Sequence, residues 1–145
     1  MRWFLDTNVL IAACLEEHEH HGRALPVLQE IHRGKAQGAT SAHALLEIYS
    51  TLTRLPRSPR MLATQVTTLI QENILNRMCT VTLSSKEYAQ LVLRLGNEAK
   101  TGGAAYDALH LACARKWAAD RIYTFNLSHF QRVAPLEIKP RIVSP

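Results

Sequence analysis

The chain has 145 residues, the length of one ordinary domain, so we expect a single domain over residues 1–145. Its hydrophobic fraction of 47% excludes intrinsic disorder, and three cysteines without a C-x-x-C pair exclude a disulfide framework and a thiolate zinc site. The net charge of +5 favours a polyanionic partner. No apolar run approaches the roughly 20 residues that span a bilayer, and no signal peptide precedes Asp6. We therefore expect a cytoplasmic protein without a membrane contact.

Short strands alternate with amphipathic helices along the chain. The first half predicts a strand over residues 2–5, a helix over 9–15, a helix closing near Gly34, a strand over 38–41 and a helix from Ser41 to Pro56. The second half predicts a helix around residues 62–70, a strand over 79–83, helices over 85–100 and 104–119, a strand over 121–125 and a last strand at 137–139. Strands separated by helices predict an α/β fold with a parallel, doubly wound sheet.

Two polar residues follow predicted strands directly. In open parallel sheets, ligands and catalytic groups gather at the carboxyl ends of the strands. Asp6 ends the first strand at the head of a helix, and taken alone it is as much a helix cap as a functional carboxylate. Asn126 follows the strand over 121–125, and taken alone it is a turn or cap residue.

Two further carboxylates lie on predicted helices. Glu47 lies about 120° from the centre of the apolar stripe of its helix, so it flanks the stripe near the same sheet edge. On its own it is best interpreted as a solvated side chain. Asp107 lies in a segment, residues 102–114, so apolar and rich in small residues that we expect close packing on most sides. A carboxylate buried there is costly unless a cation or hydrogen-bond donors compensate it, which favours a functional role.

Three carboxylates and one amide thus converge near one sheet edge. Carboxylates held close together repel one another, and one takes up a proton unless a cation neutralises them. Mg²⁺, with Mn²⁺ as a substitute, suits this set because it binds one or two carboxylates and leaves positions for water and a phosphate oxygen. Such a cation stabilises the charge that develops on phosphorus and generates hydroxide for attack. No glycine-rich nucleotide-binding motif is present.

Four segments resemble, in the same order, the motifs of the PIN-domain family. The segments are residues 5–11 (LDTNVLI), 41–48 (SAHALLEI), 106–112 (YDALHLA) and 122–130 (IYTFNLSHF). Each segment alone is a modestly specific match, but four matches in the same order over nearly the whole chain make the resemblance strong. A single short chain is most similar to the VapC-type toxins of this family.

The resemblance implies a three-layer α/β/α sandwich around a parallel sheet and a Mg²⁺-dependent endoribonuclease. It implies that Asp6, Glu47 and Asp107 are the metal-site acids, and that Asn8 and Thr124 are polar groups that orient them. VapC-type toxins are dimers that cleave RNA and are silenced by an antitoxin. The expected partners are therefore an RNA substrate, a cognate antitoxin protein and a second copy of the chain.

Asn126 departs from the family pattern, in which the fourth position is often Asp. An amide coordinates a metal or holds a water without adding charge, so a second metal would bind more weakly and we expect one-metal chemistry. Asp120 is a possible substitute acid. It precedes its strand, however, and we expect it at the opposite edge of the sheet.

Histidines offer two further candidates. The cluster His18, His20 and His21 invites a metal-site interpretation, but no second ligand group has suitable spacing, and we expect a solvated loop. His110 follows Asp107 by one helical turn and either hydrogen-bonds a carboxylate or phosphate or is an ordinary core histidine. Aromatic residues are expected in the core rather than as base-stacking platforms: Trp3, Phe4 and Trp117.

Two other classes of function remain to be compared with the nuclease. A catalytically silent PIN-fold module that binds RNA or protein is supported only by Asn126. A phospho-receiver domain also places acids at a sheet edge. It requires paired acids after the first strand and a lysine after a late strand, whereas this chain has Asp6 alone and Thr124 followed by Phe125.

Overall fold

The computed structural model describes all 145 residues and contains five strands and seven α-helices. The strands are β1 (Arg2–Leu5), β2 (Gln37–Ser41), β3 (Cys79–Val81), β4 (Arg121–Tyr123) and β5 (Ile142–Val143). The helices are α1 (Thr7–Cys14), α2 (His21–His32), α3 (Ala42–Arg54), α4 (Ala63–Ile70), α5 (Ser85–Asn97), α6 (Ala104–Lys116) and α7 (Leu127–Val133). A π-helical turn, Gln71–Leu75, continues α4, and a short 3₁₀ turn, Lys139–Arg141, precedes β5. No helix has the length and apolar character needed to cross a membrane.

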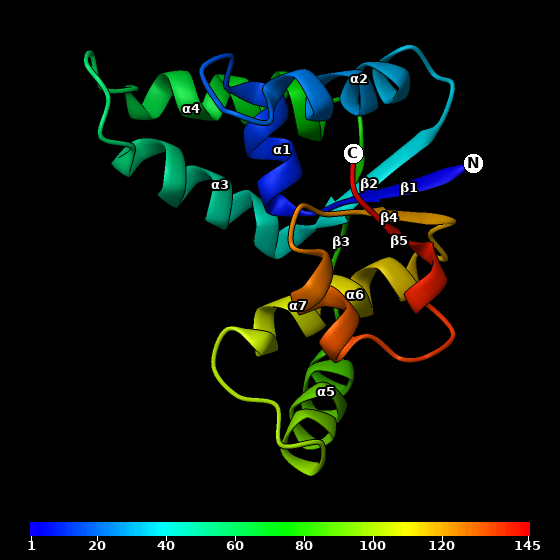
Figure 1. Cartoon of the computed structure of the whole chain (residues 1–145). Coiled ribbons are helices and arrows are strands. Elements are labelled where there is room, and N and C mark those ends of the chain that lie inside the picture. Colours follow the sequence, from blue (N-terminus) through cyan, green and yellow to red (C-terminus); the bar gives the residue numbers. More distant parts are fainter.

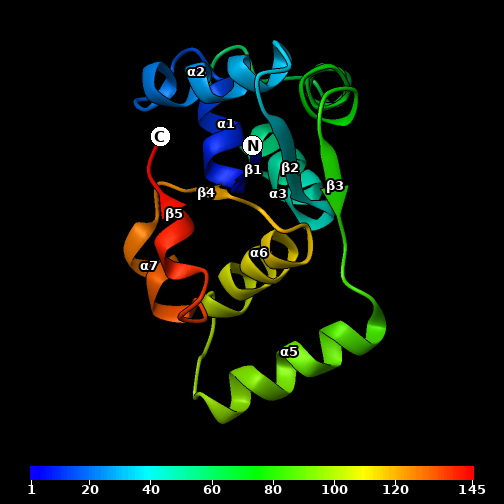
Figure 2. The same cartoon turned by 90° about the vertical axis from the view of Figure 1, so that its right-hand side faces the viewer.

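The five strands form one parallel sheet in the order β3-β2-β1-β4-β5, with β1 at its centre. Helices α1, α2, α3 and α4 lie on one side of the sheet, and α6 and α7 lie on the other (Figures 1 and 2). Helix α5 lies outside α6, at the margin of the molecule (Figure 2). The predicted three-layer α/β/α sandwich with a central parallel sheet is confirmed.

Side-chain alternation along β1 divides the core into two halves. Successive residues of a strand point to opposite faces of a sheet. Leu5 accordingly packs with the apolar residues of α1 to α4, whereas Phe4 packs with those of α6 and α7, and both side chains are fully buried. Burial on both faces holds β1 rigidly in place, so the residue that follows it, Asp6, has a well-defined position.

Two features of the structure differ from the sequence-based expectations. The strand expected at 137–139 is wrong: Ile138 is a buried core residue, Pro140 has no N–H to donate to a sheet, and the strand comes later, at β5. Helix α7 was not predicted, because seven residues are too few to reveal a helical period. The predicted helix over 85–100 is present as α5; it buries only Leu95 and leaves Val92 exposed, because α5 lies outside α6.

The cysteines give a simple test of this packing. Burial raises the pKa of the Cys14 and Cys113 thiols to about 11, whereas Cys79 is exposed at the start of β3. Because the thiolate is the reactive form, we expect one fast-reacting thiol in the native protein at pH 8 and three in guanidinium chloride. Titration with Ellman's reagent measures this. Fast reaction of two or three thiols under native conditions would contradict the packing, and Cys79→Ser should abolish the native reaction.

Candidate active site

Three neighbouring strands end at the same place and carry polar side chains into the site. Leu5 of β1 lies opposite Tyr123 of β4 in the parallel register, so the residues that follow, Asp6 and Thr124, are adjacent. On the other side of β1, the last residue of β2 is Ser41, which caps α3. All three of these polar side chains are buried, at 5% exposure or less. The amino ends of α1 and α3 also lie here, and helix amino ends attract negative charge.

Asp6 is the buried carboxylate at the centre of the site, with 3% of its surface exposed. Its Oδ1 accepts a hydrogen bond from the Thr7 amide at 2.7 Å, and its Oδ2 accepts one from the Thr124 hydroxyl at 2.9 Å. Burial raises the pKa of Asp6, and the nearby charge of Asp107 raises it further, while His110 and the two donors oppose the shift. The fold therefore buries this carboxylate, and its ionised form is less stable there than in water.

Glu47 approaches Asp6 from the second turn of α3. Its Oε1 accepts hydrogen bonds from the Thr7 hydroxyl at 3.0 Å and from His110 Nε2 at 2.8 Å. Burial alone would raise the pKa of Glu47, but the hydrogen bond and charge of His110 outweigh it, with Thr7 and His43 contributing, and the pKa is lowered. Glu47 is thus an ionised carboxylate with one oxygen engaged by the protein.

His110 connects three elements of the site. It lies on α6, buried, with Nε2 directed at Glu47 and 4.0 Å from Asp6 Oδ1. Its Nδ1 lies 2.9 Å from the Ser41 hydroxyl, which already accepts the Ala44 amide as the cap of α3. An ionised carboxylate only accepts hydrogen bonds, so Nε2 must carry the proton toward Glu47. Of the two roles left open for His110, the structure therefore combines burial with a hydrogen bond to a carboxylate.

Asp107 lies one turn before His110, on the same side of α6, and is only half-buried. The expectation of close packing on most sides is therefore wrong for this residue. The reason is its position in the first turn of α6, where the helix emerges at the sheet edge; the fully buried acid is Asp6. Burial raises the pKa of Asp107, His110 and His129 lower it, and Glu47 raises it, so its charge interacts with the rest of the site.

The other predicted site residues lie differently. Thr124 donates to Asp6 and also accepts the Asn126 amide at 3.0 Å. The Asn126 side chain, at the start of α7, makes no hydrogen bond with the acids, and Asn8 is exposed and makes none either. Thr7 does what was expected of Asn8, since it contacts both Asp6 and Glu47. A threonine one residue after a strand-end Asp was the available signal for this role.

Two groups lie outside the site. Asp120 accepts the Arg2 amide at 2.7 Å, at the opposite edge of the sheet, as its position before β4 predicted. The three clustered histidines contact protein groups: His18 Nδ1 accepts the His20 amide, His20 stacks on Phe125, and His21 Nδ1 lies 2.9 Å from the Ala12 carbonyl oxygen. His18 and His20 belong to the loop after α1, and His21 is the first residue of α2.

The oxygen atoms that remain without protein partners suit a hard cation. Asp107 accepts no hydrogen bond, and Glu47 uses Oε1 alone, so Oε2 is available together with both oxygens of Asp107. Oxygen-only donors are the set that Mg²⁺ and Mn²⁺ prefer. No three acidic, histidine or cysteine side chains are placed so that they could hold a metal ion together, so an ion bound here would need oxygens of water or substrate as further ligands.

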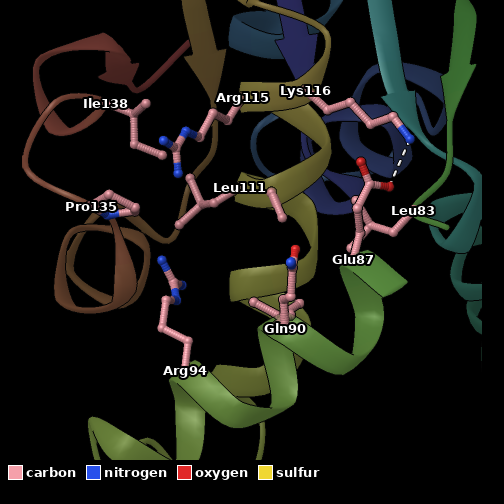
Figure 3. A pocket seen from close by; sticks show the side chains of 11 residues that line it. Leu83, Glu87, Gln90, Arg94, Leu111, Arg115, Lys116, Pro135 and Ile138 are labelled. Carbon is pink, nitrogen blue, oxygen red and sulfur yellow. Dashed lines mark hydrogen bonds and ion pairs between the residues drawn. The ribbon is translucent and has the colours of Figure 1, made fainter. Parts of the chain in front are cut away.

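A separate hollow of about 400 Å³ lies between α5 and α6 (Figure 3). Arg94 and Arg115 border it, and Lys116 pairs with Glu87 at 2.8 Å on its rim. None of the three site carboxylates lines it. The hollow is therefore separate from the candidate active site, which we identify by its buried and interacting carboxylates.

Comparison with known proteins places the chain in a family. The family model described as PIN domain matches residues 3–136. The chain belongs to the PIN-domain family. Within this family, ribonuclease VapC27 of Mycobacterium tuberculosis is 35% identical over 116 residues, 80% of this chain and 79% of that protein. Ribonuclease VapC40 of the same species is 30% identical over 140 residues, 96% and 97% of the two chains.

Solved structures show the same PIN fold. VapC20 of Mycobacterium tuberculosis, a sarcin-ricin loop cleaving toxin, superposes with a TM-score of 0.66 at 18% identity, covering 88% of this chain and 92% of that one. VapBC2 of Rickettsia felis, bound to a DNA fragment from their promoter, superposes with a TM-score of 0.63 at 20% identity, covering 100% and 98%. At these identities the structures establish the fold of the chain.

The buried charge of Asp6 predicts a gain in stability when it is neutralised. Because the pKa of Asp6 is raised in the folded protein, its charge destabilises the fold only above the ordinary carboxyl pKa. The loss of stability grows with pH and is complete above the raised pKa. In EDTA at pH 7 we expect Asp6→Asn to increase the free energy of unfolding by on the order of 1 kcal/mol. The gain should vanish below about pH 4, where the unfolded carboxyl is protonated.

Thermal unfolding with and without Mn²⁺ checks this. Mn²⁺ should raise the Tm of the wild type and not that of Asp6→Asn. If Asp6→Asn is less stable than the wild type in EDTA at pH 7, the interpretation that the buried charge of Asp6 destabilises the folded protein is wrong.

His110 predicts an effect on cation binding through Glu47. We expect His110→Leu to weaken Mn²⁺ binding by about 10–100-fold, because Glu47 loses the donor that orients it. Calorimetric titration measures the affinity. The control is His32→Leu, since His32 is half-buried, lies on α2 away from the acids and hydrogen-bonds only with the Asn73 carbonyl oxygen at 3.0 Å. Equal affinities in the two variants would exclude an orienting role for His110.

Proposed function

We propose that this chain is a Mg²⁺-dependent endoribonuclease and the toxin component of a type II toxin–antitoxin pair. The observation that carries the proposal is the convergence of Asp6, Glu47 and Asp107, from a strand end and two helices, on one interacting site. Family membership and relatives that are named ribonucleases support the same reaction class.

The chain's residues perform distinct tasks in this reaction. Asp107 and Glu47 Oε2 supply free carboxylate oxygens, and Asp6 adds buried negative charge beside them. A Mg²⁺ ion held there supplies charge neutralisation at the phosphate and lowers the pKa of a water for attack on phosphorus. Thr7, Thr124 and His110 fix the carboxylates by hydrogen bonds, so that little reorganisation accompanies the reaction.

One-metal chemistry is the form of the reaction that we propose. Asn126 adds no charge, and its side chain makes no hydrogen bond to the acids. With three carboxylates rather than four, the site compensates one divalent ion well and a second one poorly.

Exposed apolar side chains support the protein partners of the proposal. Helix α3 exposes Leu46, and the following helix has Leu62 exposed just before its first turn. Helix α5 exposes Val92 and Leu93 on the opposite side of the molecule (Figure 2). Helices on both sides of the sheet thus expose apolar side chains, and we propose that a cognate antitoxin and a second copy of the chain cover some of them.

RNA cleavage by the purified protein tests the proposed function. Total RNA is incubated with protein freed of any co-purified partner, in Mg²⁺ or Mn²⁺, with EDTA and Asp6→Asn as controls. We expect cleavage that requires the cation and falls by at least about 100-fold in Asp6→Asn, because loss of an acid that holds the cation removes charge stabilisation from the transition state.

The negative results are also informative. Cleavage that persists in EDTA or in Asp6→Asn would exclude the metal mechanism. Protein that binds Mn²⁺ and RNA but cleaves no RNA in a panel of transfer, ribosomal and messenger RNA would be the silent module that Asn126 suggests. The matched control substitution is Asp120→Asn, an acid at the opposite sheet edge, which should leave cleavage unchanged.

A further inference from the structure

A stack of two aromatic rings lies at the rim of the candidate active site. The rings of His43, on α3, and Tyr106, on α6, are nearly parallel, with centroids 5.1 Å apart and an interplanar angle of 8°. His43 in turn lies 6.1 Å from the ring of His110, which contacts Glu47. A series of rings therefore leads from the buried carboxylates to the surface.

The stack is tied to the carboxylates by position and by contact. His43 lies one turn before Glu47 on α3, with its Nε2 3.7 Å from Glu47 Oε1. Tyr106 directly precedes Asp107 in the first turn of α6. A group that lies against Tyr106 is thus next to the carboxylates at which we propose the cleavage to take place.

Most of the Tyr106 side chain is exposed to solvent and does not pack in the core. It is 55% exposed, and its hydroxyl makes no hydrogen bond within the chain. His43 covers one face of the ring, so most of the remaining surface is open to solvent. The other aromatic residues considered for base stacking are less available: Phe4 is fully buried, and Trp3 and Trp117 are half-buried and pack against the two halves of the core.

We propose that Tyr106, supported by His43, is a stacking platform for an unpaired nucleobase of the RNA next to the scissile phosphate. This inference rests on the proposed function and adds a substrate-binding site to it. An exposed aromatic face binds any base by stacking, and sequence-tolerant binding of single-stranded RNA commonly uses such faces. The parallel contact with His43 fixes the orientation of the tyrosine ring, so that little conformational freedom is lost on binding.

RNA binding in EDTA tests the platform without cleavage. The probe is a short single-stranded RNA with 2-aminopurine placed at each position in turn, and the fluorescence of this base falls when it stacks. For Tyr106→Leu we expect the Kd to rise on the order of tenfold, as for loss of one base–aromatic stack. Quenching should disappear at one probe position. Tyr106→Phe retains the ring and should restore both properties.

Tyr88→Leu is the matched control. Tyr88 is 41% exposed on α5, away from the carboxylates, so its removal should leave RNA binding unchanged. A second measurement uses the unaltered protein: an abasic nucleotide at the quenched position should weaken binding to the wild type but not to Tyr106→Leu. The wild-type half of this comparison does not depend on how a variant folds.

The outcomes separate the platform from the nuclease. Tyr106→Leu that binds the probe as tightly as the wild type, or no effect of the abasic nucleotide, would overturn the platform while cleavage by the wild type still stood. Tyrosine-dependent quenching in a protein that cleaves no RNA would support the platform and overturn the proposed function. A loss of binding in Tyr106→Leu that accompanies a lower molecular mass in light scattering would assign the ring to a subunit interface and overturn the inference.

Discussion

The site depends on one costly interaction, the burial of the Asp6 carboxylate at the end of the central strand. Strand β1 is covered on both faces, so the residue that follows it cannot move away from the core to reach water. The chain compensates with two hydrogen bonds and a nearby histidine, and the pKa of Asp6 remains raised all the same. A carboxylate in this condition gains most from a cation, which is why we connect its burial with metal binding.

The positions of the groups around Asp6 depend on where the strand ends. Thr7 can contact both Asp6 and Glu47 because it is the first residue of α1 and its hydroxyl faces α3. His110 reaches Glu47 because α6 crosses the same sheet edge from the other layer. Hydrogen bonds therefore join residues of both helical layers across the end of the sheet. Such networks hold functional groups in place before a substrate arrives.

The proposed chemistry and the proposed recognition of a base would use different parts of the same helices. On α6, Asp107 and His110 face the carboxylates, whereas Tyr106 faces solvent. On α3, Glu47 faces the site, whereas His43 supports the tyrosine ring. The group proposed to act on a phosphate and the group suited to a base are thus one turn apart on α3 and consecutive on α6, so a displacement of either helix would alter both proposed functions together.

The sequence by itself determined the parallel sheet, the elements that carry Asp6, Glu47 and Asp107, and the family, because periodicity and short motifs are local properties of the chain. Only the tertiary structure decided that Thr7 rather than Asn8 contacts the carboxylates, that Asp6 rather than Asp107 is the buried acid, and that His110 bonds to Glu47. The ring contact between His43 and Tyr106 likewise joins two helices 63 positions apart, the same separation as between Glu47 and His110. Which side chains meet across such distances is set by how the layers pack, and no local pattern in the sequence records it.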